Sequence, residues 1–337
     1  MLYPEFITKG KTIGVTSPSD GKTDKLDLIR LDNAYKKLKN LGYEIVETPN
    51  VRKSIKGRSA NAKLRAKYLE DLFQDNNVKV IISAGGGDFL VEILPYIDFN
   101  ILKNNPKWFC GFSDNTAIGF ILTTKLDIAS LYSDNISCFG MEPWHESINN
   151  YLKILQGNII EQSNFTKYQS SYSEYKTGLE SYTLDKEVSW NNLTNEKTTK
   201  LEGRLIGGCL DVLLNLVGTK YDYVKTFIEK YKDDGIIWFL ESCELTSEQL
   251  IRGLWQLKEA GWFKYIKGFI FGRPILEKSY YNINYEEALK ESLKDLNVPI
   301  ITSACFGHTS PKITIINGSY AKITSENKKG TIKMELK

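Results

Sequence analysis

The sequence predicts an α/β protein of two domains, an N-terminal parallel-sheet α/β domain followed by a C-terminal α+β domain with a smaller β-rich core. Three observations support this. Strand-like and helix-like segments alternate through the first 157 residues, this periodicity stops between 158 and 200, and 337 residues are long for one core but comfortable for two. We therefore expect domains over residues 1–157 and 201–337, joined by a connection over residues 158–200.

The N-terminal segments alternate between β-rich runs and amphipathic stretches with helical spacing. Leu28, Leu31, Tyr35 and Leu38 recur at helical intervals, and Gly42 closes that helix. Strands followed by helices at this spacing favour a parallel sheet with helices on both faces. The expected strands cover 11–16, 43–48, 78–83 and 108–111, and the expected helices include 60–75 and 117–124.

The connection is rich in Ser, Thr, Asn, Tyr and Glu, with a β-hairpin possible around Val188–Trp190. Beyond Gly203 we expect helices over 210–217 and 246–260, the second opened by a Thr246/Gln249 capping box. Apolar runs over 236–240 and 267–272 predict buried strands. Residues 312–336 predict antiparallel strands with turns at 317–318 and 327–330.

Composition excludes several classes of function. The net charge of +3 comes from 44 basic and 41 acidic side chains that are scattered along the chain, so nucleic acid is not expected as a partner. The five cysteines form no CxxC pair, which argues against a disulfide framework or structural zinc and favours a reducing, cytoplasmic setting. We expect neither a secretion signal nor a membrane span, which needs about 20 apolar residues.

Only two histidines are available as a general base working near neutral pH. His145 precedes an expected helix, whereas His308 follows the apolar run 299–304 and a glycine. Functional side chains of α/β proteins gather at the ends of strands, which favours His308. The alternative is a histidine that is merely hydrogen-bonded in a loop.

Ser113 follows an apolar strand and opens a helix, within the sequence Gly111-Phe112-Ser113-Asp114-Asn115. This strand–turn–helix setting is typical of a nucleophile elbow, although Asn115 stands where the usual pattern has a second glycine. A helix N-terminus can also stabilise a developing oxyanion. The alternative is that Ser113 or Asp114 simply caps the next helix.

Three further positions at strand ends carry polar or glycine residues. Glu241 ends a buried strand and could orient a histidine, cap a turn or pair with Arg252. Gly85–Gly87 permits a close approach of backbone amides to a ligand, or forms a tight turn or phosphate loop. The segment 16–23 ends in Gly-Lys-Thr, but Thr16 stands where a phosphate-binding P-loop requires glycine.

Together these loops resemble those of the LD-carboxypeptidase family of serine peptidases, which includes the microcin C immunity peptidases. The resemblance spans nearly the whole chain. It is carried by TIGVTSPSD near the start, by the segment from Gly85 to Ala117, and by three segments of the second half, residues 202–222, 235–263 and 306–319.

The resemblance implies a catalytic triad of Ser113, Glu241 and His308, in which the glutamate orients the histidine. It also implies an oxyanion hole built from backbone amides, which map here to Gly86, Gly87 and Asp114. The family is usually dimeric, so the resemblance implies a homodimer, and it implies no metal and no cofactor. The expected reaction is hydrolysis of an amide through an acyl-serine intermediate.

Two branches of the family differ in substrate. One releases the terminal D-Ala from muropeptides in peptidoglycan recycling, and the other cleaves an aminoacyl-nucleotide amide in microcin immunity. The long connection containing Trp190 looks more like the second branch, with Trp190 stacking on the base. A core position in a hairpin is the other reading of Trp190. Cys209 is a substrate-binding candidate, although some relatives carry Asn there.

Two functions from other classes stay open at this point. One is a non-catalytic two-domain protein that binds a nucleotide or peptide. The other is a nucleotide-dependent enzyme that uses the Gly-Lys-Thr loop.

Overall fold

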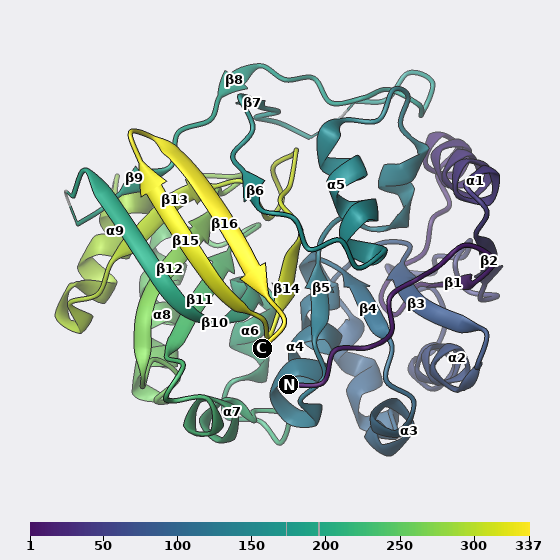
Figure 1. Cartoon of the computed structure of the whole chain (residues 1–337), viewed down its shortest axis with the longest axis horizontal. Coiled ribbons are helices and arrows are strands. Elements are labelled where there is room, and N and C mark those ends of the chain that lie inside the picture. The colour runs from purple at the N-terminus through teal and green to yellow at the C-terminus, as the bar shows by residue number, and fades with distance from the viewer. Residues whose placement is uncertain (173, 195) are drawn as a thin grey trace.

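The N-terminal half is built on a six-stranded sheet (Figure 1). The five strands that come first in the sequence, β1 to β5, are parallel to one another. The structure, a computed structural model, describes residues 1–172, 174–194 and 196–337. The strand order is β14-β5-β4-β3-β1-β2, and β14 alone runs antiparallel to its neighbour. The strands are β1 (Thr12–Thr16), β2 (Glu44–Glu47), β3 (Val78–Ser83), β4 (Trp108–Gly111), β5 (Ser130–Tyr132) and β14 (Ile315–Asn317).

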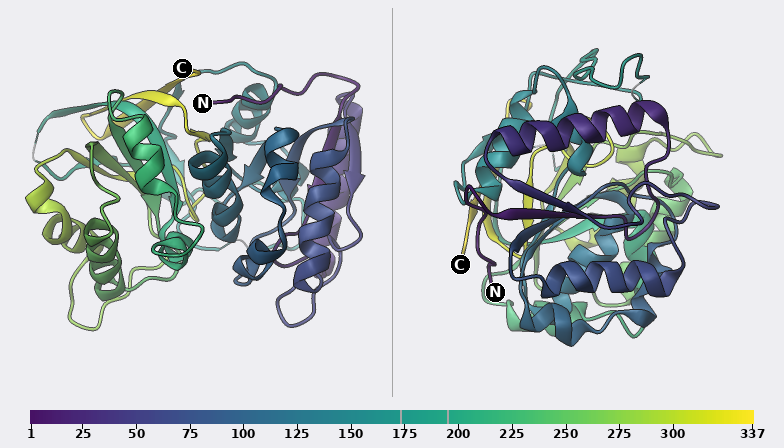
Figure 2. Two further views of the ribbon diagram at one scale, coloured as in Figure 1. Left: turned by 90° about the horizontal axis from the view of Figure 1, so that it is seen from below. Right: turned by 90° about the vertical axis from the view of Figure 1, so that its right-hand side faces the viewer.

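Helices cover both faces of this sheet, as the right-hand view of Figure 2 shows. Leu31 and Leu38 of the first helix pack with one face, while Leu69 and Phe73 of the second pack with the other. Both helices begin at a side-chain cap, Asp24 and Asn61 respectively. The helices are α1 (Lys25–Asn40), α2 (Ala62–Gln74), η1 (Leu90–Tyr96), α3 (Phe99–Asn104), η2 (Ser113–Asn115), α4 (Thr116–Leu126), η3 (Ile136–Gly140) and α5 (Glu146–Leu155).

The second sheet has eight strands within the described residues, in the order β6-β16-β15-β10-β11-β12-β13-β9. Its four central strands, β10 to β13, are parallel, and antiparallel strands flank them on both sides. The strands are β6 (Gln162–Ser163), β9 (Asn191–Asn192), β10 (Thr198–Cys209), β11 (Ile236–Glu241), β12 (Ile266–Gly272), β13 (Ile300–Ala304), β15 (Tyr320–Glu326) and β16 (Lys329–Glu335).

The remaining elements surround this second sheet. A separate pair, β7 (Lys167–Tyr168) and β8 (Lys186–Glu187), lies in the connection. The expected capping box of Thr246 and Gln249 is present at the start of α8. The helices of this half are α6 (Leu210–Leu216), α7 (Val224–Lys230), α8 (Ser247–Glu259), α9 (Tyr285–Leu293) and η4 (Lys294–Leu296).

The predicted fold class is confirmed, with a parallel-rich N-terminal sheet and a second β-rich sheet. The long strand β10 was not expected, since the sequence predicted no strand between the connection and the helix over 210–217. The strands on either side of the 317–318 turn lie in different sheets, since β14 pairs with β5. The connection supplies β6 and β9 to the second sheet. The boundaries at 157 and 200 stay a prediction.

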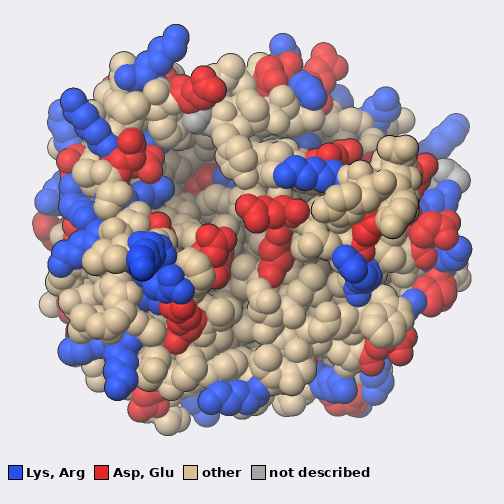
Figure 3. All heavy atoms as spheres, turned by 180° about the vertical axis from the view of Figure 1, so that it is seen from behind, with Lys and Arg blue, Asp and Glu red and all other residues tan. Residues whose placement is uncertain are grey.

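The two ends of the chain meet on one side of the molecule, as both Figure 1 and Figure 2 show. The Tyr3 hydroxyl donates to the carbonyl oxygen of Lys337 at 3.0 Å. Acidic and basic side chains are interspersed over the face in Figure 3, in keeping with the small net charge. None of the helices in the described part of the chain has the length and apolar character that a membrane crossing requires.

Candidate active site

Ser113 occupies a sharp turn between β4 and α4. Its backbone has φ of +62°, a left-handed conformation that costs a non-glycine residue roughly 1–2 kcal/mol. Gly111 allows this turn, because a Cβ there would lie 2.9 Å from the Cβ of Asn115. The turn is typical of a nucleophile elbow, which lifts the serine hydroxyl above the sheet. Neither η2 nor α4 has a side-chain cap, so the capping role considered for Ser113 and Asp114 is not observed.

The structure brings Ser113, His308 and Glu241 into one hydrogen-bonded chain. The Nε2 atom of His308 lies 3.0 Å from the Ser113 Oγ, and its Nδ1 lies 2.8 Å from Oε2 of Glu241. Glu241 is completely buried at the end of β11, and His308 follows β13 in the loop after Phe306. Of the partners considered for Glu241, His308 is the one beside it.

Gly307 permits this close contact between the histidine loop and β11. Its φ is +96°, and a Cβ there would lie 2.8 Å from the Glu241 carboxylate and 2.9 Å from its Cβ. Any larger residue would push the loop away from Glu241. His308 therefore reaches the carboxylate because the residue before it has no side chain.

The charges of this pair stabilise one another. Burial raises the pKa of Glu241, but the charge and hydrogen bond of His308 outweigh it, so the net shift is downward. Burial lowers the pKa of His308, and the Glu241 carboxylate more than compensates, so its net shift is upward. Glu241 therefore stays ionised and favours the imidazolium form of His308.

Tyr132 joins the pair from the other sheet. Its hydroxyl donates to Oε1 of Glu241, and the Ser113 backbone is hydrogen-bonded to the same tyrosine oxygen. Burial, together with the nearby carboxylate, raises the pKa of Tyr132 well above its usual value, so the hydroxyl keeps its proton. Tyr132 thus links the serine turn on β4 to the carboxylate on β11.

The glycine loop after β3 lies directly against the serine. A Cβ on Gly86 would lie 3.2 Å from the Ser113 Oγ and 3.9 Å from the amide nitrogen of Asp114. Gly87 has φ of +147°, and a Cβ there would come within 2.4 Å of the Ser19 Oγ. The predicted oxyanion-hole residues Gly86, Gly87 and Asp114 are therefore grouped beside Ser113.

The Asp114 side chain hydrogen-bonds the loop after β1 and the end of the glycine loop to the serine turn. Its Oδ2 accepts hydrogen bonds from the Ser19 hydroxyl at 2.5 Å and from the Leu90 amide at 2.8 Å. Burial raises the pKa of Asp114 to about 6, although both hydrogen bonds act in the opposite direction. The carboxyl group therefore holds the loop after β1 and the end of the glycine loop against the serine turn.

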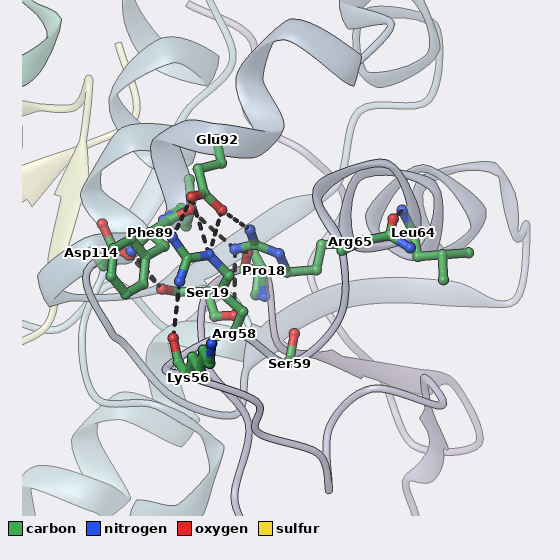
Figure 4. Close-up of polar contacts among 12 residues, drawn as sticks. Pro18, Ser19, Lys56, Arg58, Ser59, Leu64, Arg65, Phe89, Glu92 and Asp114 are labelled. Carbon is green, nitrogen blue, oxygen red and sulfur yellow. Dashed lines mark hydrogen bonds and ion pairs between the residues drawn. The ribbon is translucent and has the colours of Figure 1, made fainter.

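A buried arginine, Arg65, is hydrogen-bonded to two of these loops (Figure 4). Arg65 of α2 is fully buried and donates to the carbonyl oxygens of Pro18 at 3.0 Å and Phe89 at 3.1 Å. Its charge is paired with Glu92 at 2.6 Å, and Arg58 binds the same carboxylate. Because an unpaired buried guanidinium costs several kcal/mol, Glu92 is needed to keep Arg65 in this place.

Two cavities adjoin the serine and the histidine. The larger, of about 330 Å³, is lined by His308 and Phe112, by the cations Lys22, Arg30 and Lys312, and by Tyr172, Tyr175 and Tyr182. The smaller, of about 120 Å³, is lined by Ser113, Cys209, Cys243 and four acids, Asp88, Asp114, Asp211 and Glu244. Both cavities can therefore deliver a ligand to the hydrogen-bonded chain.

Trp190 lies away from both cavities, which corrects the expectation that it stacks on a substrate base. It is 1 % exposed, its amide donates to the carbonyl oxygen of Lys328, and its ring fills the space beside Gly330. Trp190 is therefore a core residue, but not in the expected hairpin around 188–190, since β8 pairs with β7 and β9 with β13. Cys209, by contrast, is at the site, with its Sγ beside Glu241 and 3.5 Å from Asp211.

Sequence reasoning missed the aromatic lining of the larger cavity and the support around the serine. The tyrosines at 172, 175 and 182 lie in the connection, where Tyr enrichment was the available signal. Lys312, which is buried and paired with Asp134, lies four residues after His308. For Tyr132 and Arg65 there was no local signal, because their partners are distant in the chain.

The sequence matches two domain profiles of one family. The LD-carboxypeptidase N-terminal domain matches residues 13–133, and the LD-carboxypeptidase C-terminal domain matches residues 202–323. A putative carboxypeptidase of Vibrio cholerae is 29% identical over 99% of this chain and 98% of its own. A probable murein peptide carboxypeptidase of Bacillus subtilis is 25% identical, over 98% and 93% respectively. The Escherichia coli microcin C7 self-immunity protein MccF is 26% identical, over 95% and 92%.

Solved structures of MccF and of an MccF-like protein have the same fold as this chain. An MccF-like protein of Bacillus anthracis superposes with a TM-score of 0.84 at 27% identity, covering 100% of both chains. MccF in complex with aspartyl sulfamoyl adenosine has the same fold, with a TM-score of 0.81 at 23% identity over 100% of this chain and 99% of its own. Since the two profiles together match well over half of its residues, this chain belongs to the LD-carboxypeptidase family and is a hydrolase of the serine-peptidase type.

Proposed function

We propose that this protein is a serine carboxypeptidase that hydrolyses an amide bond through an acyl-enzyme on Ser113. The observation that carries the proposal is the continuous chain from Ser113 to His308 at 3.0 Å and from His308 to Glu241 at 2.8 Å. A nucleophile, a base within hydrogen-bond reach and a group that orients the base are the parts that this chemistry requires.

In the first step His308 Nε2 accepts the Ser113 proton as the hydroxyl attacks the amide carbon. The amides of Gly86, Gly87 and Asp114 stabilise the negative charge that develops on the carbonyl oxygen. His308 then passes the proton to the leaving amine, and the acyl-serine is hydrolysed by a water that His308 deprotonates. Glu241, held by Tyr132, keeps the imidazole oriented and stabilises its charged form.

Two substrate classes fit this proposal. One is a muropeptide that releases D-Ala in peptidoglycan recycling, as the name of the Bacillus subtilis relative suggests. The other is an aminoacyl-nucleotide amide, as the name of MccF and its complex with aspartyl sulfamoyl adenosine suggest. The larger cavity favours the second class, because tyrosine rings and the cations Lys22 and Arg30 suit a base and an anionic group.

The competing function is a non-catalytic protein that binds a nucleotide or peptide in the same cavity. It does not account for the left-handed backbone of Ser113 or for the buried charge of Glu241, both of which cost stability. A homodimer in the cytoplasm is part of our proposal, and the five free cysteines suit a reducing compartment.

A hydrolysis assay with two substrates side by side tests the proposal, with Ser113→Ala as the control. One substrate is a muramyl tetrapeptide that ends in D-Ala, and the other is aspartyl sulfamoyl adenosine. Release of D-Ala would identify a recycling enzyme, and cleavage of the conjugate an immunity-type peptidase. Binding of either compound without turnover would support the non-catalytic function and overturn the proposal.

A further inference from the structure

Three potential metal ligands of different chemistry meet at the centre of the site. Cys209, Glu241 and His308 each offer one ligand atom, and these atoms all lie within 4.8 Å of one another. The cause is the sheet itself, since β10 and β11 are parallel and Cys209 pairs in register with Glu241. The two side chains therefore share a face, and Gly307 brings His308 against them.

This set of donor atoms suits zinc. Thiolate sulfur, imidazole nitrogen and carboxylate oxygen are its usual ligands, at about 2.0–2.3 Å from the ion. Tetrahedral coordination at those distances places the ligand atoms about 3.3–3.7 Å apart. In the structure the three ligand atoms lie within 4.8 Å of one another, and Nδ1 of His308 lies 2.8 Å from Oε2 of Glu241. Shifts of about 1 Å in the side chains are therefore enough to coordinate an ion.

Two of the three ligands adjoin cavities, since His308 lines the larger cavity and Cys209 lines the smaller one. Cys209 lines that cavity beside Ser113. Four acids, Asp88, Asp114, Asp211 and Glu244, line it as well, and neither Lys nor Arg is among its described lining residues. An acidic entrance raises the local concentration of a divalent cation. The smaller cavity can thus admit a small cation as far as Cys209, whose ligand atom lies within 4.8 Å of those of Glu241 and His308.

We propose that Cys209, Glu241 and His308 form an inhibitory Zn²⁺ site. Binding displaces the Cys209 proton to solvent and uses a lone pair of the neutral His308 imidazole, with no change of oxidation state. The fourth position of the ion is left for water or the Ser113 hydroxyl. Hydrolysis stops because His308 can no longer accept the Ser113 proton. The inhibition rests on the proposed function, whereas the binding of zinc does not.

The test measures zinc binding directly, using ZnCl₂ alone as the probe, by competition with a chromogenic chelator. We expect one Zn²⁺ per chain in the wild type and in Ser113→Ala, which is inactive but keeps all three ligands. Cys209→Ser should weaken binding at least tenfold. Cys138→Ser is the matched control, since this thiol lines the larger cavity and lies outside the cluster, and its zinc affinity should equal that of the wild type.

Two further measurements keep the outcome clear if Cys209→Ser folds poorly. His308→Ala should also weaken zinc binding at least tenfold, and Co²⁺ should give a thiolate-to-metal absorption band in the wild type and in Cys138→Ser. In the assay, zinc should inhibit the wild type reversibly, with recovery on adding EDTA. Absence of stoichiometric binding, or equal affinity in wild type and Cys209→Ser, would overturn the proposal. Zinc binding without inhibition would contradict the role of His308 as the base.

Discussion

The hydroxyl of Tyr132 on β5 donates a hydrogen bond to the carboxylate of Glu241 on β11, so the two sheets meet at the carboxylate proposed to orient His308. The carboxylate is completely buried and has His308 on its other oxygen. A buried carboxylate is costly unless its oxygens are paired, which makes Tyr132 a positioning residue for the pair.

Tyr132→Phe should lower kcat by about 10–100-fold, because a hydrogen bond to a charged group is worth about 1.5–3 kcal/mol. KM should change little, because the hydroxyl faces Glu241 and Ser113. Steady-state kinetics on the cleaved substrate make the comparison. Tyr43→Phe is the control, since it removes a buried hydroxyl that accepts a hydrogen bond from Gln156, away from Glu241 and Ser113. Equal losses of kcat in the two variants would contradict this role.

The rate should rise with pH through a midpoint above the ordinary histidine value of about 6.5. The neutral imidazole is the active base, and Glu241 raises the pKa of His308, so the protonated, inactive form persists to higher pH. Glu241→Gln removes that charge and should move the midpoint of kcat/KM down by at least about one pH unit. A midpoint that is the same in the two proteins would show that Glu241 does not set the pKa of His308.

Ser19→Ala should lower kcat about fivefold, the equivalent of about 1 kcal/mol for one lost hydrogen bond. Asp114 would lose the Ser19 hydroxyl and keep the Leu90 amide as a partner, which loosens the loop after β1 and the glycine loop against Ser113. Ser59→Ala is the matched control, because Ser59 is equally buried but bonds Ser17 and Asn50 instead. Similar rates for both variants would mean that the Ser19 contact does not position the loop.

Trp190→Phe should lower the melting temperature without changing KM for either substrate class. The ring fills the core beside Gly330, so its loss removes packing rather than substrate contact. Gly330→Ala should also destabilise the protein, by about 1–3 kcal/mol, because a Cβ there would lie 1.8 Å from the indole. A several-fold increase in KM for the aminoacyl-nucleotide in Trp190→Phe would restore a stacking role.

Much of the fold follows from local patterns in the sequence. Short, continuous apolar runs between helical segments predicted β1, β3, β4 and β11, because strands buried on both faces of a parallel sheet are apolar throughout. Strand β10 was missed because its three glycines are usually turn signals. In the structure they allow close packing, and a Cβ on Gly207 would lie 1.7 Å from the carbonyl oxygen of Phe239. Local propensity carries no information about that contact.

The same limit applies to the site. Ser113, Glu241 and His308 could be predicted because each stands at a strand end within a recognisable sequence segment, and the structure places them within hydrogen-bond distance of one another. Tyr132 and Arg65 depend on partners that only the folded chain brings together, such as Glu241 and the Phe89 carbonyl. Trp190 was assigned to the substrate site because nothing in its local sequence distinguishes a side chain that faces a cavity from one that is buried in the core.

Labelling of the protein with a fluorophosphonate, followed by mass spectrometry of its peptides, tests the central claim most directly. The account predicts a single phosphonylated residue, Ser113, and no labelling in Ser113→Ala. Circular dichroism should show that both proteins are folded. His308→Ala should label far more slowly, because the serine would lose its base. An unlabelled wild type, or a label on another residue that accompanies loss of activity, would contradict the assignment of Ser113 as the nucleophile.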